Sequence, residues 1–157
     1  MTFQTRAMTP ADVPSCVAII NATIAVGGST AYEDPYEHET FEAHYLESAA
    51  TSFVVTFENR VVGFQSCFEV EPGIYSIGSF TDQERPVKGA GRALITATIA
   101  AARENDATAI LAKITSDNTG GLAYYSKVGF EDYQTVKSDL TRRDGTVVDR
   151  IIKRFVL

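Results

Sequence analysis

A glycine-rich segment carries the strongest chemical signal in this chain. Lys88-Gly89-Ala90-Gly91-Arg92 follows a strand-like stretch, and apolar residues with helical spacing follow it. Two glycines two positions apart let successive backbone N–H groups converge on one point. The start of a helix adds unpaired N–H groups and the positive end of the helix dipole. The segment therefore predicts a site for a phosphate or pyrophosphate, with Lys88 and Arg92 adding positive charge.

The same segment is also compatible with a tight strand-to-helix turn that binds nothing. It is not a Walker loop, because no Gly-Lys-Ser/Thr follows four spacer residues. It is not a dinucleotide fingerprint either, because position 94 is Leu94 and not a third glycine.

A second group of residues lies about 30 positions further on and comprises Asn118, Tyr125 and Gly129. Asn118 and Tyr125 are seven positions apart, about two helical turns, so they share a helix face. Gly129 suits the end of that helix. The Tyr125 hydroxyl can donate a proton to a leaving group, or the ring can simply pack in the core. Tyr124 is expected on a different face.

The elements that must position these residues change character along the chain. The first half predicts a strand, a helix that begins after Thr9, an irregular segment, a short helix and an antiparallel meander. The second half predicts a helix of about 15 residues after the glycines, and then alternating strands and helices. The predicted ranges are strands 2–7, 52–57, 60–69, 74–81, 107–114, 130–137 and 147–156, and helices 10–26, 39–48 and 118–127. We therefore expect an α+β domain spanning 1–157, with one mixed, mostly antiparallel sheet flanked by helices on both sides.

Composition narrows the class of protein. The net charge of −6 disfavours nucleic acid or an anionic membrane as a partner, so an anionic ligand must be held by local groups. Cys16 and Cys67 have no metal-type spacing, and His38 and His44 belong to no metal motif, so we expect no metal site. No signal peptide or membrane span is evident, which predicts a cytoplasmic protein.

The segments KGAGRAL and NTGGLAYYSKVGF, in this order of elements, resemble the GNAT superfamily of N-acetyltransferases from Phe3 to Phe155. The N-terminal segments NATI and STAYEDP are similar to the branch that acetylates phosphinothricin and methionine sulfoximine. The resemblance implies transfer of an acetyl group from acetyl-CoA to the primary amine of a small molecule, such as an amino acid or an analogue. It implies direct attack by the amine, with no covalent enzyme intermediate.

The resemblance also implies roles for individual residues. Tyr125 would be the general acid that protonates the leaving thiolate. Tyr32 would be a wall of the acceptor pocket, and Glu33 would meet a substrate ammonium. The residues implied for acetyl-CoA are the loop Val87, Lys88, Gly89, Ala90, Gly91 and Arg92 for the pyrophosphate, and Gly78, Ser79, Phe80, Thr81 and Asn118 for the pantetheine arm.

Two departures from the family pattern leave questions open. Pro86 stands where the family usually has Gln or Arg, and it removes an N–H donor. Ser76 stands where that branch has a glutamate base, so the base is Glu33, Glu69 or Glu71, or a water chain carries the proton. Alternatives are a peptide or protein N-acetyltransferase and a non-catalytic acyl-CoA-binding module. The resemblance further suggests a homodimer.

Overall fold

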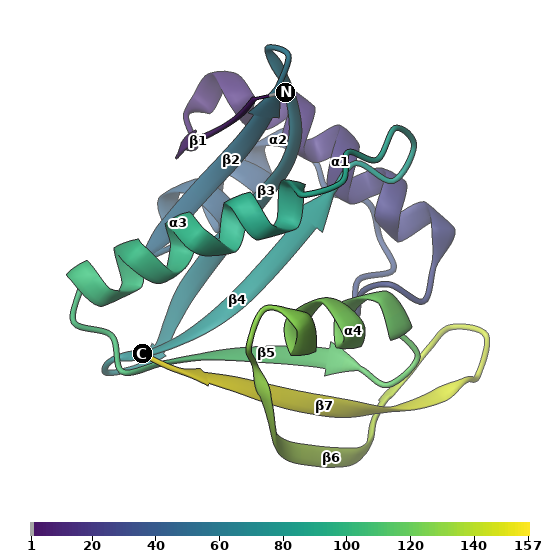
Figure 1. The fold of residues 1–157 in the computed structure, drawn as a ribbon. Helices are drawn as coiled ribbons and strands as arrows, with labels where there is room; N and C mark the ends of the chain where they lie inside the picture. Colours follow the sequence, from purple (N-terminus) through teal and green to yellow (C-terminus); the bar gives the residue numbers. More distant parts are fainter. Residues whose placement is uncertain (1) are drawn as a thin grey trace.

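Seven strands form one mixed sheet in the computed structural model, which describes residues 2–157 (Figure 1). The strand order is β1-β2-β3-β4-β5-β7-β6, and every neighbouring pair is antiparallel except β4 and β5. The bounds are β1 Phe3–Ala7, β2 Thr51–Phe57, β3 Arg60–Glu71, β4 Ile74–Thr81, β5 Ala109–Thr115, β6 Glu131–Thr141 and β7 Val147–Val156. The predicted α+β class and mixed sheet are confirmed.

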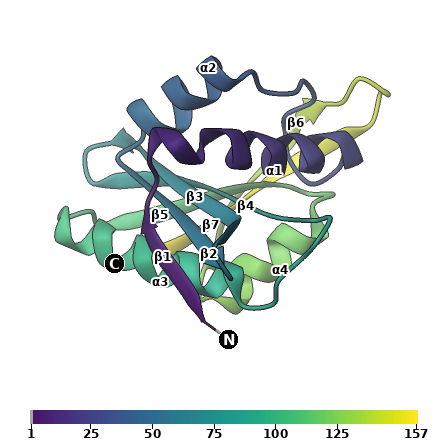
Figure 2. The same ribbon diagram turned by 90° about the horizontal axis from the view of Figure 1, so that it is seen from above.

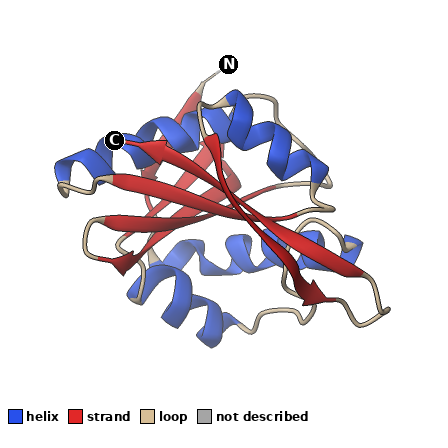
Figure 3. Cartoon of the chain, turned by 90° about the horizontal axis from the view of Figure 1, so that it is seen from below, coloured by secondary structure: helices blue, strands red, loops and turns tan. Residues whose placement is uncertain are grey.

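Helices cover both faces of this sheet, as Figures 2 and 3 show. On one face lie α1 and the short α2, which continues directly into a π-helical turn, η2. On the other face lie α3 and α4. The bounds are η1 Pro10–Asp12, α1 Val13–Val26, α2 His38–Phe41, η2 Glu42–Glu47, α3 Ala90–Glu104 and α4 Thr119–Lys127.

Each face of the sheet has its own apolar core. On the α1 face, Ile20, Phe41, Tyr45 and Phe64 are almost completely buried. On the other face, α3 and α4 pack on the inward residues of β5, including Ile110. Burying one such side chain stabilises the fold by roughly 1.5–3 kcal/mol, so the two cores hold the helices firmly on the sheet.

The predicted element boundaries agree with the structure to within a few residues, except at β6. The sequence predicts an end near 137, whereas β6 continues to Thr141 because its pairing with β7 resumes at Leu140–Val148. The interruption contains Ser138, whose φ is +51°. An irregularity of this kind breaks the alternation of residues that a strand prediction relies on.

The parallel pair β4 and β5 separates along its length, as Figure 1 shows. The two strands pair only where Ile74–Ser76 meets Ala109–Leu111. Beyond that point β4 runs on to Thr81 and β5 to Thr115 without further pairing to each other. This edge of β4 therefore exposes backbone N–H and C=O groups that a bound chain can pair with.

Candidate functional site

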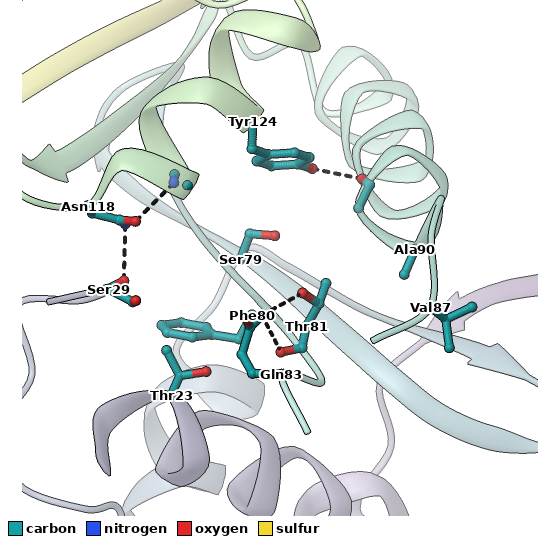
Figure 4. Close-up of a pocket in the computed structure, with 13 residues that line it drawn as sticks. Thr23, Ser29, Ser79, Phe80, Thr81, Gln83, Val87, Ala90, Asn118 and Tyr124 are labelled. Atoms are coloured by element: carbon teal, nitrogen blue, oxygen red, sulfur yellow. Dashed lines mark hydrogen bonds between the residues drawn. The ribbon is translucent and has the colours of Figure 1, made fainter. Parts of the chain in front are cut away.

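Two adjoining cavities occupy the opening between β4 and β5. One has a volume of about 320 Å³ and extends to the start of α3, and we call it the α3 cavity. The other has a volume of about 250 Å³ and extends to the segment 29–32, and we call it the Tyr32 cavity. The residues that line both are Ser29, Ser79, Phe80, Asn118, Gly121 and Tyr124. The cavities therefore meet between β4 and the first turns of α4. Figure 4 shows the residues that line the α3 cavity, among them Ser79, Asn118 and Tyr124 of this junction.

Backbone geometry shapes the α3 cavity at the predicted glycine loop. Gly89 immediately precedes α3 with a φ of +97°, a conformation that side-chain-bearing residues rarely adopt. A Cβ at this position would also lie 3.0 Å from the Phe3 ring. Only glycine fits here without strain, so the loop geometry depends on the residue type predicted from the sequence.

The loop also presents free hydrogen-bond donors. Among the described residues, no acceptor lies within hydrogen-bonding distance of the backbone N–H of Lys88, Gly89, Gly91 or Arg92, whereas Ala90 donates to Val87. A helix start with several unpaired N–H groups suits a phosphate or pyrophosphate. The predicted donor site therefore fits the residues present, with the backbone and not the side chains supplying most of the contacts.

A neighbouring carboxylate holds the turn that precedes Pro86. Asp82 Oδ1 accepts the backbone N–H groups of Glu84 and Arg85, each at 3.0 Å, and Asp82 Oδ2 pairs with Arg60 at 2.6 Å. The hydrogen bond from the Arg85 backbone, with the others, lowers the pKa of the Asp82 carboxyl. The residues that lead into Pro86 are thus held in a fixed turn.

Most of the predicted donor-site residues line one of the two cavities or both. Thr81, Val87, Ala90 and Gly91 line the α3 cavity, Gly78 lines the Tyr32 cavity, and Ser79, Phe80 and Asn118 line both. Lys88, Gly89 and Arg92 line neither cavity. Lys88 and Gly89 precede α3, and Arg92 lies in its first turn.

Tyr125 reaches the Tyr32 cavity from α4, although its ring is buried against Phe130. Within residues 2–157 its hydroxyl makes no hydrogen bond, and it is not fully enclosed by protein. Burial raises the pKa of Tyr125 well above its usual value. The hydroxyl therefore keeps its proton at neutral pH and suits a donor rather than a base.

Tyr124 lies in the same region, although the sequence placed it on a different helix face. Its hydroxyl donates to the Gly91 carbonyl at 2.7 Å and accepts from Gln65 Nε2 at 3.2 Å. The ring packs so closely on Gly91 that a Cβ there would lie 2.7 Å from it. Tyr124 therefore ties α4 to the start of α3, which Figure 4 shows. The sequence analysis missed this role and that of Gln65.

Gln65 is the buried polar residue beneath this contact. Its Nε2 also donates to Ser79 Oγ at 3.0 Å, while the described residues offer no donor to its Oε1. The one signal that could have pointed to Gln65 is an amide side chain buried in a strand next to the cavity. Buried polar groups normally have a hydrogen-bond partner.

Asn118 connects the two cavities through its side-chain amide. Its Oδ1 accepts the Gly121 N–H at 2.9 Å and caps α4, while its Nδ2 donates to the Ser29 carbonyl at 3.0 Å (Figure 4). Capping of this kind contributes roughly 1 kcal/mol. Asn118 thus lines both cavities while its side chain holds the segment 29–32 in place.

The wall of the Tyr32 cavity comes from the irregular segment predicted near 29–38. Tyr32 lines it, and its hydroxyl accepts a hydrogen bond from Tyr45 at 2.8 Å. Arg142 anchors the segment by donating to the Thr30 carbonyl at 2.9 Å while its guanidinium binds both oxygens of Asp117 at 2.8 and 2.9 Å. A turn distant in sequence therefore fixes the position of this wall.

The three candidate carboxylates lie away from this cavity. Glu33 accepts the Arg143 backbone N–H with both oxygens, each at 3.2 Å, and Glu69 accepts the Gly73 N–H at 3.1 Å. Glu33, Glu69 and Glu71 line neither cavity. The Tyr32 cavity contains no Asp, Glu or His among its lining residues, which include Ser76.

The remaining reactive groups are inert or dispersed. Cys16 and Cys67 are buried free thiols, and burial raises the pKa of each to about 12. Neither therefore supplies a thiolate at neutral pH. In residues 2–157, no three His, Cys, Asp or Glu side chains gather as a metal site would require. None of the helices in this range is long and apolar enough to cross a membrane.

Comparisons with known proteins agree with this geometry. Residues 23–130 match the acetyltransferase (GNAT) family. No curated protein matches the chain. A solved structure provisionally described as a phosphinothricin N-acetyltransferase is 25% identical, with a TM-score of 0.84 over 99% of both chains.

Two further structures share the fold. A phosphinothricin acetyltransferase from Sinorhizobium meliloti, solved in complex with acetyl-CoA, is 19% identical with a TM-score of 0.87, over 100% of this chain and 89% of that one. A ribosomal-protein-alanine N-acetyltransferase from Brucella melitensis is 23% identical with a TM-score of 0.86, over 98% and 99%. The family match covers more than half of the chain. The chain therefore belongs to the acetyltransferase (GNAT) family, and its activity is that of an acetyl-CoA-dependent N-acetyltransferase.

Proposed function

We propose that this enzyme acetylates the primary amine of a small molecule, an amino acid or an amino-acid analogue. The observation that carries the proposal is the junction of two cavities at Ser79, Asn118 and Tyr124. One cavity extends to the loop of unpaired N–H groups before α3, and the other is itself a small chamber of about 250 Å³ whose lining includes Tyr32 and Tyr45. A chamber of this size suits a small acceptor.

The chain's own groups bind the donor mainly through the backbone. The N–H groups of the loop from Val87 to Arg92, apart from the Ala90 N–H that donates to Val87, would hold the pyrophosphate, with the Lys88 and Arg92 side chains adding positive charge. The unpaired edge of β4 from Gly78 to Thr81 would pair with the pantetheine arm, which would pass Asn118. When bound, acetyl-CoA supplies a thioester carbonyl open to attack by an amine.

Tyr125 is the residue that we assign as general acid. Its protonated hydroxyl reaches the Tyr32 cavity, which adjoins the free edge of β4. Donation of that proton to the leaving thiolate completes the transfer with no covalent enzyme intermediate. A backbone N–H of β4 would stabilise the charge that develops on the carbonyl oxygen. Because no carboxylate or imidazole lines the chamber, water carries away the proton of the amine.

Tyr32 and Glu33 would act on the acceptor in different ways. Tyr32 lines the chamber and can contact the acceptor directly. The Glu33 carboxylate is held by the Arg143 N–H outside the lining of both cavities. Glu33 would therefore attract a substrate ammonium group through its electrostatic potential and not through direct contact.

A peptide acceptor is the second candidate. The likeness to the Brucella protein, which is named as an N-acetyltransferase of ribosomal-protein alanine, favours it. The anchoring of segment 29–32 by Arg142 and Asn118 disfavours it, because a peptide needs an open groove. A third possibility, a non-catalytic acyl-CoA-binding module, would retain donor binding without turnover.

We propose one domain over 1–157, a cytoplasmic location and a homodimer. The edge strand β6 and the exposed Tyr133 and Val147 provide a surface for pairing. Light scattering after size-exclusion chromatography would give the mass in solution, and a mass near the 17.1 kDa of one chain would exclude the dimer.

The proposal is tested by measuring thiol release from acetyl-CoA with a panel of amines. The panel contains free amino acids, methionine sulfoximine, phosphinothricin, simple amines and short peptides. Release stimulated by an amino-acid-like compound would support the proposal, and release stimulated only by peptides would replace it with the second candidate. Tight acetyl-CoA binding without any turnover would favour the non-catalytic module.

A further inference from the structure

The charges around the Tyr32 cavity oppose the charge of the whole protein. The chain carries a net charge of −6, yet no carboxylate lines this cavity, whereas Lys113 and Arg150 both do. Neither residue lies in the segments KGAGRAL and NTGGLAYYSKVGF. A local positive potential in an acidic protein attracts anions to that one place.

Sheet register brings the two cations together. In β5, Ile110, Ala112 and Ile114 face the core beneath α3 and α4, so Lys113 and Thr115 point to the opposite face. Thr115 pairs with Arg150 of β7, and Lys113 pairs with Ile152. Lys113 and Arg150 are therefore diagonal neighbours on adjacent strands, with Cα atoms about 7–8 Å apart. Two long side chains at that spacing can reach one small anion.

The two cations differ in how far they are already neutralised. Arg150 Nε donates to Asp139 at 3.1 Å, which uses one of its five N–H groups. Lys113 makes no ion pair and no side-chain hydrogen bond with any of residues 2–157, and it is exposed. Lys113 is therefore the principal free charge in this cavity.

The other hydrogen-bonding groups of the cavity complete the arrangement. Tyr32 accepts its hydrogen bond from Tyr45, so the Tyr32 hydroxyl proton remains available to a ligand. Ser76 of β4 adds another hydroxyl. The combination of two cations and neutral hydroxyl donors without a carboxylate suits a carboxylate or another small oxyanion.

From this arrangement we infer that the acceptor carries an anionic group beside its amine, and that Lys113 and Arg150 bind that group. The inference rests on the proposed function and adds the specificity determinant to it. Binding the anion would orient the amine towards the β4 edge. The same positive charge disfavours the ammonium form of the acceptor, which assists a site that lacks a carboxylate base.

The test compares amino acids with their own decarboxylated amines. The pairs are L-methionine with 3-(methylthio)propylamine, L-leucine with isoamylamine, and L-phenylalanine with phenethylamine. For each pair, kcat/KM of the acid is divided by that of the amine in the wild type and in Lys113→Met. Comparing this ratio between the two proteins cancels the difference in basicity of the two amines.

We expect the acid-to-amine ratio to fall at least tenfold in Lys113→Met and to be largely retained in Lys113→Arg. The KM for acetyl-CoA should not change. Lys127→Met, at an exposed position at the end of α4, is the matched control and should retain the wild-type ratio. A ratio that is the same in the wild type and in Lys113→Met would overturn the inference, while turnover of the amines would leave the proposed function intact.

If none of the six compounds is acetylated, their binding tests the inference instead. The same six compounds are then titrated into the protein saturated with CoA by calorimetry. Preferential binding of the acids that is lost in Lys113→Met supports the inference, and equal or absent binding by the wild type refutes it. Failure to bind acetyl-CoA at all would refute the proposed function separately.

Discussion

The two cavities that meet at Tyr124 are built in opposite ways. What distinguishes the α3 cavity is the loop at one end, a short run of backbone in which Gly89 has a φ of +97° and several N–H groups are unpaired. The Tyr32 cavity has no such loop and depends on residues from five separate parts of the chain: the segment 29–32, η2, β4, the β5–α4 region and β7. The loop is a local motif. The Tyr32 cavity is an assembly whose chemistry can vary while the fold stays the same.

This difference explains why the donor is identified and the acceptor remains a proposal. A backbone cradle can be recognised from glycine positions, because few residues permit its geometry. A side-chain assembly has no such signature, because Lys113 and Arg150 become neighbours only through strand register. Changes in the two regions should therefore affect different kinetic constants.

The largest effect is expected from Tyr125→Phe. Loss of the proton donor should lower kcat by about 100-fold or more while the KM for acetyl-CoA stays within about twofold. Steady-state thiol release measures both constants. Unchanged kcat would remove Tyr125 as the acid, and a rise in donor KM of the same size would show that the ring serves donor binding instead.

Gly89→Ala tests the backbone-built cavity. A side chain at positive φ, 3.0 Å from Phe3, should displace the loop and weaken acetyl-CoA binding about tenfold, equivalent to about 1.4 kcal/mol. Calorimetric titration with acetyl-CoA gives the affinity. Gly73→Ala is the matched control, since Gly73 has a φ of +76° and lies in the β3–β4 turn. Equal weakening in both variants would point to general destabilisation.

Arg142→Gln tests the Tyr32 cavity by changing a residue that does not line it. The substitution removes the bidentate contact with Asp117 and the hydrogen bond to the Thr30 carbonyl, so the segment 29–32 loses its anchor. The acceptor KM should rise several-fold, roughly the effect of losing 1 kcal/mol of positioning, while the donor KM is unchanged. Arg103→Gln, near the end of α3, is the control. An equal rise in both KM values would contradict the separation of the two regions.

The smallest expected effect is a change in the free energy of unfolding with pH. It arises in η2, which contains His44 and Tyr45. His44 stacks on Phe68 with ring centroids 4.5 Å apart, and burial lowers the pKa of His44. Because the folded state binds this proton less readily than the unfolded state, stability should decrease as the pH falls below about 6.5. His44→Phe should remove this decrease, which urea unfolding at pH 7.5 and pH 5.0 would measure.

Two checks accompany the His44 measurement. His38→Gln removes the other histidine of the chain and should leave the decrease in place. The carboxyl groups whose pKa is lowered, such as Asp12 and Asp117, lose their contribution only below their usual range near 3.8. A decrease that persists in His44→Phe between pH 7.5 and 5.0 would therefore exclude His44 as its source.

The sequence by itself determined the elements, the family and the location of the donor loop. Apolar spacing predicted the helices and strands, and the glycines of KGAGRAL predicted the turn and its unpaired N–H groups, those of Lys88, Gly89, Gly91 and Arg92. These features depend on residues close together in the chain, where local sterics and hydrogen bonding dominate. The one clear boundary error, at the end of β6, arose where an irregularity broke the alternation.

Only the tertiary structure decided what surrounds the acceptor. It placed Glu33 outside the cavity lining, brought Tyr124 into contact with Gly91, and set Lys113 beside Arg150 across β5 and β7. It also separated β4 from β5 after three residue pairs and so opened the site. These outcomes depend on contacts between residues many positions apart, and such contacts follow from register and packing, which local patterns do not encode.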